Sequence, residues 1–185
     1  MRKVLVTWIG KTDLRAPTES DLVGLGPIAQ ALAGRDFDEA FLLSDYDDKL
    51  VQPYLKCLLC RTSSRVELRH EKLSGPTQFG EIYEAAVRGV EQALGNGQLQ
   101  TELTLHLSPG TPAMAAVWII LGKTRFPAEL IESSREHGVR TASGNTMTVV
   151  LKAGSTAPGI ACWFDEVTLT EETQEQVVAT LPYPA

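Results

Sequence analysis

The chain has 185 residues, of which 43% are hydrophobic and 22% charged, a composition typical of a soluble globular protein with one full core. Its net charge is −6 and its pI about 5.1, which disfavours binding to duplex nucleic acid through a basic surface. Three cysteines argue against a secreted disulfide framework, and no apolar run reaches the roughly 18–20 residues of a membrane helix. We therefore expect a cytoplasmic protein with no membrane segment, in which a local pocket for a small anion is still compatible with the acidic charge.

Apolar periodicity predicts strands that alternate with helices along most of the chain. The expected strands cover residues 3–9, 37–44, 66–73, 103–107, 128–132 and 146–151, with a short edge strand at 160–164. The expected helices cover residues 22–33 (or only from Pro27 onward), 49–59, 79–94, 113–122 and 170–180. Residues 11–20, 135–145 and 152–159 are expected to form loops.

This order predicts an α/β fold with a doubly wound, mostly parallel six-stranded sheet and helices on both faces. The apolar run at 3–9 is typical of a strand buried on both faces, whereas the alternation at 66–73 indicates a half-exposed strand near an edge. Ligands of such sheets bind beyond the carboxyl ends of the strands. The segments to inspect are therefore 10–13, 44–46, 74–78, 108–114 and 133–135.

The turn Ser108-Pro109-Gly110-Thr111-Pro112 joins a predicted strand to a predicted helix. Gly110 allows a close backbone approach, Thr111 is a good helix cap, and Pro112 suits the first helical position. A helix amino end is a natural anion site, but a well-capped turn without a ligand explains the same residues about equally well. The helix 113–122 is apolar all round, which favours a sheet on one side and a second subunit on the other.

The loop Gly10-Lys11-Thr12-Asp13 follows the first strand and fits neither a dinucleotide fingerprint nor a Walker A motif. Lys11 and Thr12 are able to contact phosphate oxygens, although a polar surface loop is the simpler interpretation of this pattern alone.

Other reactive residue types form no recognisable catalytic or metal motif. Cys57 and Cys60 lack the further ligands of a zinc site, so we expect two buried thiols. The sequence thus predicts no catalytic residue, no metal and no cofactor. The three histidines are expected to be structural or solvated, and the three tryptophans to lie in the core or in an interface: His70, His106, His137, Trp8, Trp118 and Trp163.

Residues 106–134, HLSPGTPAMAAVWIILGKTRFPAELIESS, resemble the corresponding region of CARF domains, the CRISPR-associated Rossmann fold. They are most similar to the N-terminal sensor domain of the sigma-54-dependent activators of RNA-repair operons. The shared pieces are Gly110-Thr111, Trp118, 125–128 and 131–134, and the segments MRKVLVTWIGKTD and QFGEIYEAAVRGV are similar too. The resemblance covers roughly residues 1–151.

The resemblance implies a Rossmann-like homodimer with one symmetric pocket for a short RNA-derived oligonucleotide. That ligand is either cyclic oligoadenylate or RNA ending in a 2′,3′-cyclic phosphate. The expected role is a ligand sensor in transcription regulation, and the alternatives are a metal-independent ring nuclease and a purely structural dimerisation module. The implied ligand-binding residues are Gly10, Lys11, Thr12, Asp13, Ser44, Ser108, Pro109, Gly110, Thr111, Met114 and Ser133, and the implied dimer interface is Met114, Val117 and Trp118.

Two further expectations concern a departure from the family and the end of the chain. The family turn often carries Lys or His after Gly-Thr, whereas Pro112 stands here and removes one phosphate contact. Residues 1–170 are expected to form the sensor domain. Residues 171–185 are expected to form a helix or linker leading toward an ATPase and DNA-binding effector.

Overall fold

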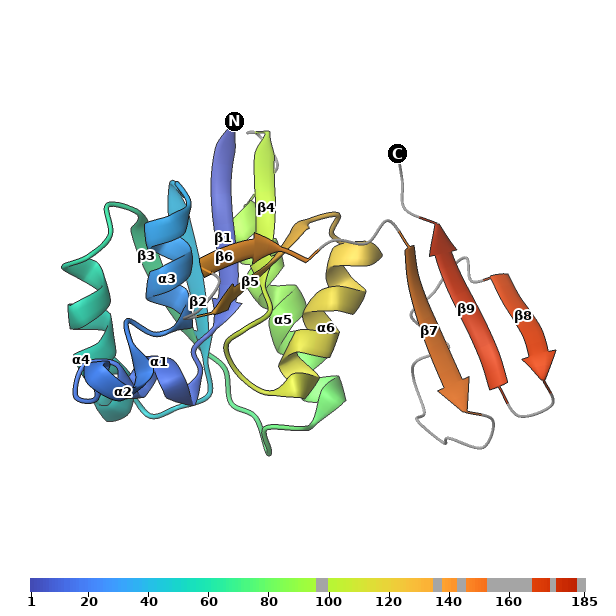
Figure 1. Cartoon of the computed structure of the whole chain (residues 1–185), viewed down its shortest axis with the longest axis horizontal. Helices are drawn as coiled ribbons and strands as arrows, with labels where there is room; N and C mark the ends of the chain where they lie inside the picture. The colour runs from blue at the N-terminus through green and yellow to red at the C-terminus, as the bar shows by residue number, and fades with distance from the viewer. Residues whose placement is uncertain (96–99, 135–137, 143–145, 153–167, 174–175, 183–185) are drawn as a thin grey trace.

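The computed structural model describes residues 1–95, 100–134, 138–142, 146–152, 168–173 and 176–182 (Figure 1). Its main body is a six-stranded sheet in the order β3-β2-β1-β4-β5-β6. The first five strands are parallel and β6 pairs antiparallel with β5. Their bounds are β1 Arg2–Trp8, β2 Glu39–Ser44, β3 Arg65–His70, β4 Thr101–His106, β5 Glu129–Ser134 and β6 Gly138–Thr141.

Helices cover both faces of this sheet. Successive side chains of a strand point to opposite faces, so the apolar strands contribute to two separate cores, one beneath each layer of helices. On one face, side chains such as Val6 and Leu105 pack against α5 and α6. On the other face, side chains such as Leu5 and Leu42 pack against α3 and α4. The bounds of the helices are α1 Lys11–Arg15, α2 Ser20–Val23, α3 Pro27–Gly34, α4 Asp48–Leu59, α5 Phe79–Leu94 and α6 Pro112–Lys123.

The doubly wound α/β fold is thus confirmed, including β1 inside the sheet and β3 at its edge. The helix expected at 22–33, or only from Pro27 onward, has the later of these two starts, since α3 begins at Pro27. Proline suits that position because its fixed φ and missing N–H cost nothing in the first helical turn.

Several predicted elements are wrong. Residues 11–15 form α1 rather than a loop, because Asp13 caps the backbone of Gly10. Residues 138–141 form β6, whose polar sequence suits an exposed edge strand but looks like a loop. The sixth strand of the sheet is therefore β6 and not 146–151.

The C-terminal part forms a second, separate sheet of three antiparallel strands in the order β7-β9-β8. The expected helix at 170–180 is wrong: residues 170–173 lie in β8 and residues 176–180 in β9, and their Thr and Val residues favour strands. The proposed edge strand at 160–164 lies outside the described residues, as do His137 and Trp163. The bounds are β7 Thr146–Lys152, β8 Thr168–Thr173 and β9 Gln176–Pro182.

Candidate functional site at the carboxyl edge of the sheet

Two strand-to-helix turns meet at the carboxyl edge of the sheet. Val6 of β1 pairs with Leu105 of β4, so the chain beyond each strand brings Gly10 beside the Pro109–Gly110 peptide. A Cβ placed on Gly10 would lie only 2.7 Å from the backbone N of Gly110. The two loops predicted from the sequence to form one site therefore touch through their backbones.

Gly110 has a conformation that other residues rarely adopt. Its φ is +89°, and a Cβ there would lie 2.7 Å from Sδ of Met114 and 3.3 Å from Cβ of Trp8. Glycine is therefore needed both for the turn and for its close packing on the core.

Asp13 holds the first turn in place from inside the protein. Its side chain is fully buried and accepts hydrogen bonds from the N–H of Gly10 (3.0 Å), the N–H of Ile28 (3.0 Å) and the hydroxyl of Tyr54 (3.3 Å). One carboxylate thus ties the end of β1 to the starts of α1 and α3 and to α4. Asp13 belongs to the site as a support and is not itself exposed to a ligand.

Burial changes the acidity of this pair. Loss of solvent raises the pKa of Asp13 to about 6, although the three donors around the carboxylate favour its charged form and oppose the rise. Burial and the neighbouring Asp13 carboxylate raise the pKa of Tyr54 as well, so the phenol stays neutral and remains a donor.

Thr111 holds the second turn in place. Its hydroxyl oxygen accepts a hydrogen bond from the N–H of Met114 (3.3 Å), which caps α6 as the sequence predicts. The same hydroxyl donates to the backbone oxygen of Pro76 (2.8 Å), in the loop between β3 and α5. This hydroxyl is therefore already engaged, whereas Ser108, Gly110 and Pro112 of the same turn are exposed.

Ser108 and Ser133 join the neighbouring ends of β4 and β5. The N–H of Ser133 donates to Oγ of Ser108 (2.7 Å), and the Ser133 hydroxyl donates to the backbone oxygen of Pro27 (3.0 Å). Oγ of Ser133 also lies 2.8 Å from Nε2 of His106. Because the single Ser133 proton goes to Pro27, Nε2 of His106 carries the proton in their shared bond.

The side chain of His106 lies fully buried beside Ser133. It is fully buried, and burial lowers its pKa to about 3, so it takes up protons too weakly for general-base work near neutral pH. Its Nδ1 has no hydrogen-bond partner within the described part of the chain. The sequence interpretation of His106 as structural agrees with this geometry, but its contact with Ser133 could be found only in three dimensions.

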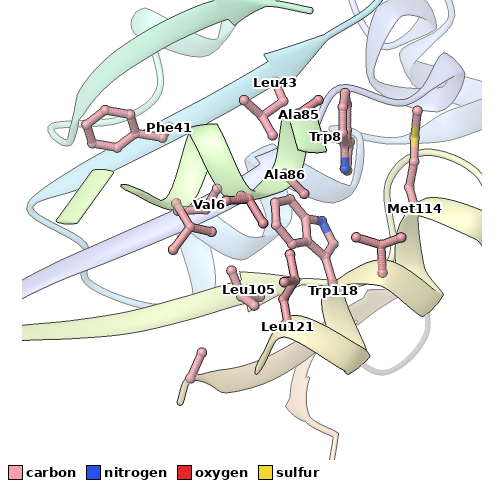
Figure 2. Close-up of a cluster of buried hydrophobic side chains, with 14 of the residues drawn as sticks. Val6, Trp8, Phe41, Leu43, Ala85, Ala86, Leu105, Met114, Trp118 and Leu121 are labelled. Carbon is pink, nitrogen blue, oxygen red and sulfur yellow. The ribbon is translucent and has the colours of Figure 1, made fainter. Parts of the chain in front are cut away.

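The three residues predicted for the dimer interface lie inside this chain's own core. Met114, Val117 and Trp118 are at most 2% exposed and pack inside this chain's own core. Figure 2 shows Trp118 and Met114 close to Trp8, whose ring centre lies 6.3 Å from that of Trp118. Side chains buried in this way are not available to a second subunit.

The predicted site residues thus divide into supports and exposed groups. Asp13, Ser44, Pro109, Met114 and Ser133 are buried, and Ser44 accepts a hydrogen bond from the N–H of Tyr46 (3.1 Å). The exposed groups at the meeting point of the two turns are Lys11, Thr12, Ser108 and Gly110. They offer one cationic side chain, two hydroxyls and backbone, which suits contact with phosphate oxygens.

The described part of the chain also carries cysteines and other residue types that can bind metals. Among those residues, no group of three or more His, Cys, Asp or Glu side chains is arranged to hold a metal ion. Cys57 is half-buried and Cys60 exposed, so the expectation of two buried thiols is wrong. No helix in the described segments is long and apolar enough to cross a membrane.

Two hollows lie at the opposite, amino edge of the sheet. They have volumes of about 180 and 400 Å³ and share Lys3, Arg35, Asp36 and Phe37. Both carry mixed charge, and Arg35 is held by Glu129 at 2.6 Å. Neither hollow is lined by a residue of the carboxyl-edge site.

Comparison with known proteins supports the fold. No family model matches this chain, and no curated protein sequence matches it. Among solved structures, it is similar to Enterococcus italicus Csm6 bound to cyclic hexa-2′-fluoro-hexa-dAMP, with a TM-score of 0.60 and 15% identity. The likeness covers 77% of this chain and 36% of the Csm6 chain, so this chain spans about a third of that protein's length.

Csm6 is a CARF-domain protein, so this likeness supports the Rossmann-like, CARF-like fold that the sequence predicts. It does not single out the sigma-54-dependent activators within that class.

Proposed function

We propose that this chain is a sensor domain that binds a short RNA-derived oligonucleotide at the carboxyl edge of its sheet. The observation that carries the proposal is the contact between the two turns at Gly10 and Gly110, which gathers Lys11, Thr12 and Ser108 on one exposed rim. A neighbour with the same fold is bound to a cyclic oligonucleotide, which supports this ligand class. The candidate ligands are cyclic oligoadenylate and RNA ending in a 2′,3′-cyclic phosphate.

The rim supports phosphate binding in a chain whose net charge is negative. Lys11 supplies a positive charge at the start of α1, while Asp13, two residues later, is turned inward onto three donors. The carboxylate thus stabilises the turn without facing the ligand. Recognition at such a rim depends on a few directed contacts rather than on a broad basic surface.

We further propose that the domain acts as a homodimer that regulates an attached or partner effector in transcription. Since the inner face of α6 is filled by the core, the contact would use its half-exposed apolar residues Ala115, Ala116, Ile119 and Ile120. Sedimentation of the whole chain with and without ligand measures this assembly.

Titration calorimetry of the whole chain with cyclic tetra-adenylate, cyclic hexa-adenylate and RNA ending in a cyclic phosphate tests the ligand. We expect Lys11→Ala to weaken binding about tenfold or more and to leave the melting temperature unchanged, because it removes a charge-assisted contact from an exposed site. Lys56→Ala is the matched control, since Lys56 is also exposed but lies in the last turn of α4. A folded protein that binds none of the three ligands contradicts the proposal.

The alternative activity is metal-independent cleavage of cyclic oligoadenylate. Lys11, Thr12 and Ser108 would have to assist it, because His106 is buried and too weakly basic. Chromatography of labelled ligand after long incubation separates the two activities: we expect intact ligand, and linear products would favour the nuclease.

A further inference from the structure

Phe79 is an exposed aromatic residue next to the proposed rim. Its side chain is 46% exposed, and no other aromatic residue in the described part of the chain belongs to the exposed class. It is the first residue of α5, directly after the loop that follows β3. An isolated exposed apolar residue is common on protein surfaces, so its position decides whether it has a role.

The loop before Phe79 is fixed to the second turn of the site. The backbone oxygen of Pro76 accepts the hydrogen bond from Thr111 (2.8 Å), and the N–H of Gln78 donates to the oxygen of Gly75 (3.2 Å). Figure 1 shows the amino ends of α5 and α6 close together beyond the same edge of the sheet. Phe79 therefore follows, by three residues in the chain, the Pro76 carbonyl that binds the Thr111 cap.

The nearest acidic side chain of α5 is already engaged. The carboxylate of Glu81 accepts hydrogen bonds from the N–H and the hydroxyl of Ser74, which holds the loop in its turn. These bonds lower the pKa of Glu81, so it stays ionised and bound to the loop. The aromatic ring is the apolar surface that remains exposed at this corner.

The core does not need this ring. The inward face of α5 is supplied by fully buried residues further along, among them Ile82, Ala86 and Val90. Truncation of Phe79 should therefore change a surface and leave the packing of the helix intact.

The two sides of the second turn differ in chemistry. The first turn, which meets the second at Gly110, carries the charge of Lys11 and the hydroxyl of Thr12, and the loop that meets the second turn at Thr111 leads to the exposed aromatic ring of Phe79. A nucleotide has the same two parts, an anionic phosphate and a flat base that stacks on aromatic rings. We propose that Phe79 is a stacking surface for one base of the oligonucleotide whose phosphates contact the Lys11 rim; this inference rests on the proposed function.

Calorimetry of the whole chain with cyclic tetra-adenylate and cyclic hexa-adenylate tests the inference. We expect Phe79→Ala and Phe79→Leu to weaken binding about tenfold, since stacking of one base contributes that much, whereas Phe79→Tyr stays within about threefold. Leu59→Ala is the matched control, because Leu59 is 54% exposed but ends α4 at the far edge of the sheet. The affinity for a sugar–phosphate oligomer of equal length without bases should be the same in Phe79→Ala as in the unchanged chain.

The other possible outcomes contradict either the proposed function or the stacking role of Phe79. If the unchanged chain binds neither adenylate, the proposed function fails first. If it binds them but Phe79→Ala binds equally well, or if Phe79→Leu matches Phe79→Tyr, the stacking role is wrong while the sensor remains. If sedimentation shows that Phe79→Ala disrupts self-association of the ligand-free chain, Phe79 is an interface residue instead.

Discussion

The two turns of the site solve the same problem with different groups. Each follows a buried strand, precedes a helix and must satisfy backbone N–H groups at a helix start. The first turn uses the buried carboxylate of Asp13, which reaches Gly10, Ile28 and Tyr54. The second uses the hydroxyl of Thr111, which caps α6 and also binds the oxygen of Pro76.

This difference separates the residues that build the rim from those that are free to use it. The best capping residues, Asp13 and Thr111, already have partners, so an oligonucleotide bound as proposed would contact their neighbours. On the first turn these neighbours are the side chains of Lys11 and Thr12, and on the second they are the backbone at Gly110 and the Ser108 side chain. The first turn thus supplies the positively charged side chain of the rim, and the second supplies exposed backbone and a hydroxyl.

The largest effect is expected where the turns touch. Gly10→Ala places a Cβ 2.7 Å from the backbone N of Gly110, and because backbone cannot rotate away, the turns must separate. We expect the free energy of unfolding to fall by about 3 kcal/mol and oligonucleotide binding to be lost. Urea unfolding and calorimetry measure both.

Gly80→Ala is the matched control, since a Cβ at this helical glycine meets nothing within 4 Å. It should leave stability unchanged or raise it slightly. Equal stability of the two variants would show that the turns are not in contact.

The next effect is a dependence of stability on pH, which we expect from the Asp13 carboxylate of the first turn but not from the Thr111 hydroxyl of the second. Burial raises the pKa of Asp13 from 3.8 to about 6, so between these values the folded chain holds a proton that the unfolded chain has lost. The contribution of Asp13 is therefore greatest below about pH 4 and is lost as the pH rises to about 6, by on the order of 3 kcal/mol at most.

Urea unfolding of the unchanged chain and Asp13→Asn across pH 4 to 8 measures this difference. The advantage of the unchanged chain over the variant should shrink as the pH rises through this window. Other carboxylates, such as Glu71 beside Arg69 and Arg88, have lowered pKa values and titrate alike in both proteins. Parallel pH profiles would mean that the folded environment leaves the Asp13 pKa unchanged.

The smallest effect is expected at the second turn. Thr111→Val keeps the shape of the side chain but removes the α6 cap and the bond to Pro76, which should cost about 1 kcal/mol. Thr111→Ser keeps the hydroxyl and should retain most of this stability. Thermal unfolding compares the pair, and an effect as large as that of Gly10→Ala would reverse the ranking of the two turns.

Local signals were sufficient for much of the fold. The apolar runs of β1 and β4 and the stripe of α5 are visible in the sequence because burial imposes a period on neighbouring residues. The α6 cap at Thr111 and the start of α3 at Pro27 are likewise local, since a cap depends on residues three positions apart. The sequence alone therefore determined the α/β class and the two turns of the site.

Only the tertiary structure decided which residues of those turns are buried and which are exposed. The β1–β4 register brings Gly10 to Gly110, and Asp13 turns inward because its donors come from α3 and α4. Trp118 lies in the core rather than at a subunit contact because α5 covers that side of α6. An apolar helix, a polar edge strand such as β6 and a capping carboxylate each have several local interpretations, and long-range contacts choose among them.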